Sequence, residues 1–125
     1  MERNTRQRDA VRNAMRKGAR PMNPAEVLAA ARRSVRTLSL ATVYRTLRSM
    51  VESGEAAAVA LPGEPARYEL KHAAERHHHH FRCERCDRVF DIEGCTPGIA
   101  ALLPRGFRMT GHDITIFGVC AGCGG

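Results

Sequence analysis

Histidine and cysteine side chains gather in the second half of this 125-residue sequence. Four consecutive histidines, residues 77–80, lead into the pair Cys83-x-x-Cys86, and a second pair, Cys120-x-x-Cys123, follows later. Imidazole and thiolate are ligands that zinc and iron prefer. Two such cysteine pairs predict one closed, structural zinc site, because four thiolates leave no position open for water. Two redox-active pairs are the weaker alternative, since a thioredoxin-like motif needs a βαβ setting that the sequence lacks.

The histidine run is expected to form part of a strand. Residues 77–83 contain Phe81 and precede a cysteine pair, and residues 89–93 (VFDIE) alternate in the same way, so we expect two strands of one sheet. Side chains on a strand alternate between faces. His77 and His79 would then face one way and His78 and His80 the other, which predicts two metal sites back to back. A merely solvated run is the alternative, and an internal run does not suggest an expression tag.

Each predicted site needs further ligands. For the site of His78 and His80 the candidates are Asp91 on the paired strand, Glu69 at the end of a hairpin, and His72 in a connector. For the site of His77 and His79 the candidates are His112 from a late strand, Glu93 and Cys95, the last two ahead of a helix begun by Thr96-Pro97. Imidazoles with a carboxylate suit Zn²⁺, Fe²⁺ or Mn²⁺, and all three metals stay open.

Bulk composition points to a folded protein away from membranes. The 125 residues are enough for one ordinary domain or two small ones, and a hydrophobic content of 43% predicts that the chain folds. No apolar run approaches the ~20 residues of a membrane span, and the start, MERNTRQRDA, lacks the apolar core of a secretory signal. We therefore expect a cytoplasmic protein. Its five cysteines would stay reduced there, which favours metal binding over disulfides.

The net charge of +7 lies in the front of the chain. Residues 1–55 hold twelve Lys and Arg against five Asp and Glu, whereas residues 77–125 hold five of each. A basic front half suggests a polyanionic partner such as nucleic acid. A solvated basic surface is the alternative.

The front half predicts three helices and a β-hairpin. Thr5 is expected to cap a helix that ends at Gly18, Asn23-Pro24-Ala25-Glu26 to begin one that ends near Arg33, and Ser39 to cap a third that ends at Gly54. The third helix has an apolar stripe of Leu40, Val43, Leu47, Met50 and Val51. Strands AAAVAL and ARYEL around the turn LPGEP would then form a wing.

Four residues of the third helix fall off its apolar stripe: Thr42, Tyr44, Arg45 and Arg48. Arginine can hold guanine bidentately and tyrosine can contact a thymine methyl group or a phosphate, so we expect this helix to enter the major groove of DNA. In the alternative, Tyr44 merely packs against the wing. The fold class is therefore α+β, with a winged helix-turn-helix domain at 1–70, a connector at 71–76, and a metal-binding α/β domain with a small antiparallel sheet at 77–125.

The segments LATVYRTL, HHHHFRCERC and GFRMTGHDITIFGVCAGC, with the basic first helix, together resemble the ferric uptake regulator (Fur) superfamily. The resemblance covers nearly the whole chain. It implies a metal-responsive transcription factor, usually a repressor, whose C-terminal domain forms a homodimer or a larger tetramer. It also implies that the winged helix binds an AT-rich palindrome of double-stranded DNA when the sensing site holds Zn²⁺, Fe²⁺ or Mn²⁺.

The resemblance assigns roles residue by residue. The structural zinc ligands would be Cys83, Cys86, Cys120 and Cys123. Sensing ligands would include His78, His80 and Asp91, and a second site would include His77, His79 and His112. Tyr44 and Arg45 match recognition-helix contacts, and Arg3 loosely matches a basic residue that many members insert into the minor groove.

The sequence also departs from the family pattern. Many members take one sensing ligand from the position just before the second helix, where this chain has Met22, a poor ligand for these metals. Glu69 keeps the strand register and His72 keeps the distance to the histidine run, so either could complete the site, with His72 favoured. The usual glutamate of the second site has no clean match, and Cys95 is the nearest by counting back from Gly106.

Three other functions compete with a metal-responsive regulator. A peroxide-sensing repressor is less favoured because of Met22. A zinc buffer or metal chaperone would explain the histidines but not the DNA-reading front half, and a DNA binder with purely structural metals would ignore chelators. An enzyme is not expected, because there is no H-E-x-x-H and the carboxylates near the histidines look like ligands.

Overall fold

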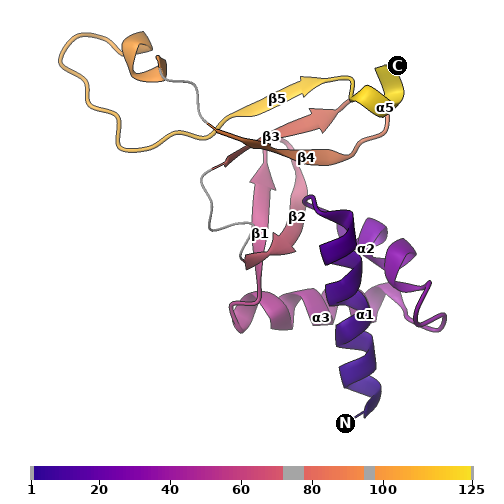
Figure 1. Ribbon diagram of the computed structural model, residues 1–125. Coiled ribbons are helices and arrows are strands. Elements are labelled where there is room, and N and C mark those ends of the chain that lie inside the picture. Colours follow the sequence, from indigo (N-terminus) through magenta and orange to yellow (C-terminus); the bar gives the residue numbers. More distant parts are fainter. Residues whose placement is uncertain (1, 72–77, 95–97, 125) are drawn as a thin grey trace. The chain divides into compact units, whose positions relative to one another are not determined.

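The structure is a computed structural model that describes residues 2–71, 78–94 and 98–124 (Figure 1). The chain divides into two compact units, Met1–Arg76 and His77–Gly125. Apart from Lys71, the predicted connector at 71–76 lies outside the described residues. Among the described helices, none combines the length and the apolar character that a membrane crossing requires.

The first unit begins with the three helices that the sequence predicts. They are α1 (Glu2–Gly18), α2 (Pro24–Ala31) and α3 (Leu40–Glu52). The expected start of α1 was wrong, because Thr5 lies inside the helix rather than at its cap. The residues before Thr5 continue the helix. The helix ends because Ala19 adopts a left-handed φ of 51°.

The second helix begins with the capping box that its sequence predicts. The Asn23 side chain accepts a hydrogen bond from the Glu26 N–H at 2.8 Å, and the Glu26 carboxylate accepts one from the Asn23 N–H at 3.0 Å. Pro24 occupies the first turn, where its missing N–H costs nothing.

The third helix buries a narrower stripe than its sequence suggests. Ser39 caps it as expected by accepting from the Thr42 N–H at 3.1 Å. Val43, Leu47 and Met50 are buried, but Leu40 and Val51 are 41% and 37% exposed. At 100° per residue these two lie at one edge of the apolar arc, so they flank the core rather than fill it.

One hydrophobic core joins the three helices and the start of the hairpin. Its members are Ala10, Val11, Ala14, Met15, Met22, Val27, Ala31, Leu38, Val43, Leu47, Met50 and Ala56. Ala10, Val11, Ala14 and Met15 form the buried face of α1.

The hairpin consists of β1 (Ala56–Leu61) and β2 (Glu64–Leu70), which pair antiparallel (Figure 1). Gly63 allows the tight turn because its φ is +73°. Met22 and Tyr68 exchange two backbone hydrogen bonds of 2.9 Å, which tie β2 to the connection between α1 and α2. The predicted order of three helices and a hairpin is thus present.

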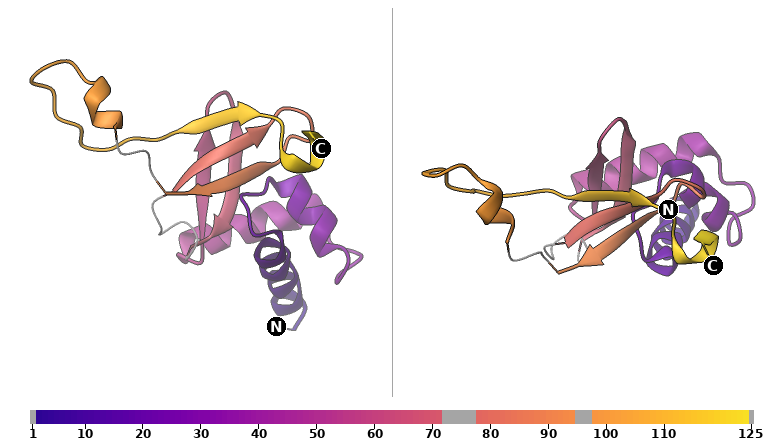
Figure 2. Two further views of the ribbon diagram at one scale, coloured as in Figure 1. Left: turned by 45° about the horizontal axis from the view of Figure 1, so that its top comes forward. Right: turned by 90° about the horizontal axis from the view of Figure 1, so that it is seen from above.

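The second unit contains a three-stranded sheet in which β3 (His78–Cys83) lies between β4 (Val89–Glu93) and β5 (Thr115–Gly118) (Figure 2). The two predicted strands are confirmed and pair antiparallel. The prediction that the whole sheet is antiparallel was wrong, because β5 runs parallel to β3. Parallel strands need a long crossover, and the segment between β4 and β5, which includes the 3-10 turn η1 (Ile99–Leu102), supplies it. The short helix α5 (Ala121–Gly124) ends the described chain.

Candidate metal centres and an exposed basic helix

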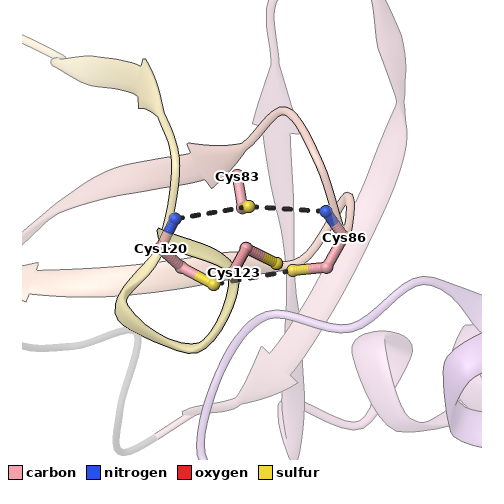
Figure 3. Close-up of side chains that lie close together, drawn as sticks. All are labelled: Cys83, Cys86, Cys120 and Cys123. Carbon is pink, nitrogen blue, oxygen red and sulfur yellow. Dashed lines mark hydrogen bonds between the residues drawn. The ribbon is translucent and has the colours of Figure 1, made fainter. Parts of the chain in front are cut away.

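The four predicted zinc ligands meet at one end of the sheet (Figure 3). Cys83 ends β3, Cys86 lies in the following turn, Cys120 follows β5, and Cys123 lies in α5. Their four Sγ atoms lie within 4.8 Å of one another, and those of Cys86 and Cys120 are 3.8 Å apart. A tetrahedron with Zn–S bonds of about 2.3 Å has sulfur–sulfur distances of about 3.8 Å. The cluster therefore fits a zinc ion.

The backbone around the cluster favours thiolate at Cys83. The N–H groups of Cys86 and Cys120 each donate to the Cys83 Sγ at 3.4 Å, and they lower the pKa of that thiol to about 6. The neighbouring Cys120 and burial raise the pKa of Cys123 to about 12. Four thiolates at this separation repel one another, so they need a cation in place of their protons.

The histidine run alternates as predicted where its side chains are described. His80 lies directly opposite Asp91 across β3 and β4, and its Nε2 is 3.4 Å from the Asp91 Oδ1. His79 lies on the other face, where its Nε2 is 3.1 Å from the Nε2 of His112. His79 and His80 are both buried, with 4% and 8% of their surface exposed, respectively. Imidazole and carboxylate at this spacing are able to share a divalent cation.

In the structure, the two Nε2 atoms of His79 and His112 form a hydrogen bond. The Ile114 N–H donates to the His79 Nδ1 at 3.3 Å, so that nitrogen is the acceptor of a neutral ring. The His79 Nε2 then carries the proton and donates to His112. A metal-ligating histidine usually donates from its other nitrogen. Metal binding by His79 therefore requires a turned ring or a displaced Ile114 amide.

Two expectations for the second site need correction. His112 was expected on a late strand, but it lies in the irregular segment just before β5. Glu93 lies opposite His78 at the end of β4, so it shares a face with Asp91 and faces away from His79. Residues directly opposite each other in an antiparallel pair have their side chains on the same face, so the pairing with His78 fixes the face of Glu93.

The remaining predicted ligands are distributed as follows. Glu69 lies on β2 opposite Ala57 and is buried. His72, His77 and Cys95 lie outside the described residues, and for His78 only the backbone is described.

The helix α3 presents the polar surface that its sequence predicts. Tyr44 is 51% exposed, and Arg45 and Arg48 are exposed as well. The Arg45 Nη2 donates to the Thr42 Oγ1 at 3.1 Å, and the same hydroxyl accepts from the Ser39 hydroxyl at 3.0 Å. These contacts orient one arginine on the exposed face. Arg3 lies in the first turn of α1, and its side chain is not described.

An ion cluster that the sequence did not predict holds α1 to the end of α3. The Glu55 carboxylate accepts from Arg8 Nη2 at 3.1 Å and from Arg12 Nε. Arg8 also donates to the hydroxyls of Ser49 and Ser53 at 2.9 and 3.1 Å. Hydrogen bonds from these arginines lower the pKa of Glu55, and the one from Arg12 has the larger effect. The spacing of Arg8 and Arg12, one helical turn apart off the apolar face, was the available signal.

These features define a class: a three-helix unit with a hairpin, followed by a small mixed sheet that carries four clustered cysteines and two histidine contacts. The model of the ferric uptake regulator family matches residues 2–117. The chain belongs to that family.

Individual relatives carry several names. The ferric uptake regulation protein of Campylobacter jejuni is 34% identical over 91 residues, 69% of this chain and 55% of that protein. The peroxide operon regulator of Bacillus subtilis is 31% identical over 91 residues, 69% of this chain and 59% of that protein. The chain therefore spans little more than half the length of these relatives.

Solved structures agree with the fold. A zinc-bound manganese uptake regulator is 25% identical with a TM-score of 0.76, and the match covers 91% of this chain and 87% of that one. FurB from M. tuberculosis, a zinc uptake regulator, is 30% identical with a TM-score of 0.52, over 97% of this chain and 95% of that one.

Proposed function

We propose that this protein is a metal-responsive transcriptional repressor that binds a palindromic double-stranded operator as a homodimer. A structural Zn²⁺ is held by the four clustered cysteines, and a regulatory Zn²⁺, Fe²⁺ or Mn²⁺ controls DNA binding. Family membership and the names of the relatives support this function. The first unit is then a winged helix-turn-helix whose α3 enters the major groove.

The observation that carries the proposal is the pairing of His80 with Asp91 across β3 and β4. A buried imidazole beside a half-buried carboxylate is expensive to maintain without a role. His80 lies three residues before Cys83 on β3, the strand that follows the predicted connector. A metal that is also bound by His72 of the connector would link this site to the DNA-binding unit.

The mechanism is a population shift. Without the regulatory metal, the two DNA-binding units of the dimer sample many placements, and the metal favours the one that matches two operator half-sites. Such couplings are typically ~1–3 kcal/mol. In this mechanism the four-cysteine zinc maintains the sheet, and the His80 site responds to metal supply.

The sensing site must be completed without Met22. This side chain is 3% exposed within the core of the first unit, and its backbone is paired with Tyr68. It therefore acts as a packing residue where many relatives have a ligand. Glu69 or His72 supplies the missing ligand, with His78 as the remaining member. Separate Glu69→Gln and His72→Ala variants identify the ligand, because only loss of the true one raises the metal concentration needed for operator binding.

The second site remains a prediction for His77, His79, His112 and Cys95. The strand register argues against Glu93 as a member. The hydrogen bond from Ile114 to His79 further implies that this site binds metal more weakly than the first.

The test begins with an operator. Duplexes are selected from random-sequence DNA by the protein loaded separately with Zn²⁺, Fe²⁺ or Mn²⁺, and affinity for the selected duplex is then titrated under buffered metal. We expect one metal to tighten binding by 5- to 150-fold. Binding that ignores every metal until the four-cysteine zinc is stripped would instead indicate a DNA binder with purely structural metal.

His80→Ala should remove the metal response and leave the dimer folded. Asp91→Asn should weaken it as well, and Asp87→Asn is the matched control, because Asp87 lies in the turn with a φ of 65°, which Asn tolerates. The measurements are operator affinity with and without metal, and dimer mass. An unchanged metal response in His80→Ala would contradict the assignment of the sensing site.

Peroxide sensing is the second candidate, favoured by the similarity to the B. subtilis peroxide operon regulator. Peroxide treatment of the Fe²⁺-loaded protein decides between the two functions. Under the main proposal, operator affinity stays unchanged and mass spectrometry shows no oxygen added to any histidine. Metal buffering, the third candidate, would show as metal uptake without binding to any duplex.

A further inference from the structure

A notch of about 290 Å³ opens between α1 and α3, next to the exposed face of α3. Its lining comes from two elements of the same unit and consists of Gln7, Arg8, Thr42, Arg45, Thr46 and Ser49. Two guanidinium groups, one carboxamide and three hydroxyls thus surround it, and no carboxylate is among the lining residues. Such a set of donors suits a ligand with several acceptor oxygens and a negative charge.

The notch is built rather than incidental, because its two arginines are held in place. Arg8 donates to Ser49, Ser53 and Glu55, which engages four of the five N–H donors of its guanidinium. Within the described residues, one Nη1 donor is left for a ligand. Arg45 is fixed by Thr42, whose hydroxyl is oriented in turn by Ser39. Fixed donors lose little conformational entropy when they bind.

The charge around the notch is positive where a ligand would enter. Glu55 stands behind Arg8, outside the lining, and shares its two oxygens between Arg8 and Arg12, which also pairs with Asp9. That four-residue cluster is neutral as a whole. The surplus positive charge comes from Arg45 in the notch, with Arg48 one turn further along α3.

We infer that the notch between α1 and α3 binds one phosphodiester group of the DNA backbone in each half-site, and so sets the register of α3 in the groove. The inference rests on the proposed function and adds the chemical group that this surface takes. In helix-turn-helix proteins, contacts to phosphates fix orientation while base contacts specify sequence. Arg8 and Gln7 place such a contact on α1, directly beside Arg45 on the recognition helix.

The test pairs protein variants with modified operator duplexes. In a series of duplexes, each phosphate in turn is replaced by an uncharged methylphosphonate, and affinities are measured for the wild-type protein and for Arg8→Gln. We expect one position per half-site at which the replacement weakens the wild type about tenfold, in line with a lost charge-assisted hydrogen bond. At that position Arg8→Gln should show almost no further loss.

Two further variants separate the notch from general charge and from folding. Arg16→Gln is the matched control, because Arg16 is an exposed arginine on the same helix outside the notch. Arg8→Gln should lower the salt slope of log K by about 0.9, and Arg16→Gln should leave it unchanged. The double variant Gln7→Met, Thr46→Val removes notch donors without changing charge, and it should weaken specific and non-specific DNA alike while Tm is retained.

The outcomes are distinct. Equal effects of Arg8→Gln and Arg16→Gln, or no methylphosphonate position coupled to Arg8, would overturn the notch assignment while operator binding by the wild type stands. Tight binding of inorganic phosphate that needs Arg8, without any coupled position in DNA, would overturn it in favour of a small-anion site. Failure of every duplex at every metal load would remove the proposed function and the notch assignment together.

Discussion

At the scale of single residues, protons and metal compete for the same ligand atoms. The Cys83 thiol has a pKa of about 6 and the Cys123 thiol one of about 12, although they belong to one cluster. Metal binding must therefore release protons, the Cys123 proton among them. The affinity of the cluster for zinc falls as pH falls, because protons then occupy the sulfur atoms.

Cys83→Ser should abolish zinc binding and unfold the second unit. Cys83 is fully buried and accepts two backbone N–H groups, so no surface ligand can replace it. Zinc content by mass spectrometry should fall from one ion to none per chain at the four-cysteine site. The matched variant is Cys95→Ser, a change at the fifth cysteine, which belongs to neither C-x-x-C pair and should keep the zinc. A folded, zinc-loaded Cys83→Ser protein would show that three cysteines suffice.

Sequence periodicity predicted which site residues lie on strands. It did not predict features that depend on the pairing of strands or on segments far away in the sequence. Alternation along β3 places His79 and His80 on opposite faces, and the short turn at the first cysteine pair aligns His80 with Asp91. The same register removes Glu93 from the His79 site, which counting along one strand cannot show. The direction of the Ile114 N–H toward His79 depends on the path of a segment 35 residues away.

At the scale of secondary-structure elements, local capping signals predicted where α2 and α3 begin, but not where α1 begins. The capping box of α2 and the Ser39 cap of α3 are short-range patterns with defined hydrogen bonds, and both are present. Thr5 also has a capping side chain, but charged residues before it extend α1. The direction of β5 depends on how a long crossover returns to the sheet, which no local pattern encodes.

Glu55→Gln should loosen the attachment of α1 to α3. The carboxylate lies against Arg8 and Arg12 and is 26% exposed, so solvent screening keeps the loss to about 1 kcal/mol of unfolding free energy. The measurement is urea unfolding of both proteins. Glu52→Gln is the matched control, because Glu52 is an exposed glutamate three residues earlier. A loss equal to that of the control would mean that the ion cluster adds no stability.

The same pair of proteins predicts a pH dependence. Arg12 and Arg8 lower the pKa of Glu55 below its ordinary value of 4.5, so the carboxylate stabilises the fold fully above about that pH. The contribution is lost as pH falls through the lowered pKa. The difference between wild type and Glu55→Gln should therefore be constant near neutrality and shrink in more acidic solution. A difference that grows with acid would contradict the sign.

At the scale of the whole molecule, the two units differ in charge. The excess of Lys and Arg lies in residues 1–55, and the metal ligands lie mainly in residues 77–125. DNA affinity should therefore depend steeply on salt through the first unit. Metal dependence should come from the second. Under the proposed function, two copies of the chain place two recognition helices on a palindrome.

The proposed dimer predicts a role for the open edge of β5. Among the described strands, β5 pairs only with β3, and its Ile116 and Phe117 are each 48% exposed. Carbonyl groups of Ile114 and Gly118 accept from the amides of His80 and Glu84, so alternate residues face β3 and the Phe117 N–H points to the open edge. A second copy of β5 could pair there across a two-fold axis.

Phe117→Pro should therefore produce a monomer with an intact sheet. Proline removes the outward N–H in both copies of a two-fold interface, while the inward bonds to β3 are untouched. Phe117→Val is the matched control, because it keeps the N–H and suits a strand. Mass by light scattering should halve for the proline variant alone, with zinc content unchanged and operator affinity strongly reduced, since one recognition helix is lost from each complex. A dimer that survives the proline would place the interface away from this edge and leave the exposed phenylalanine without a role in assembly.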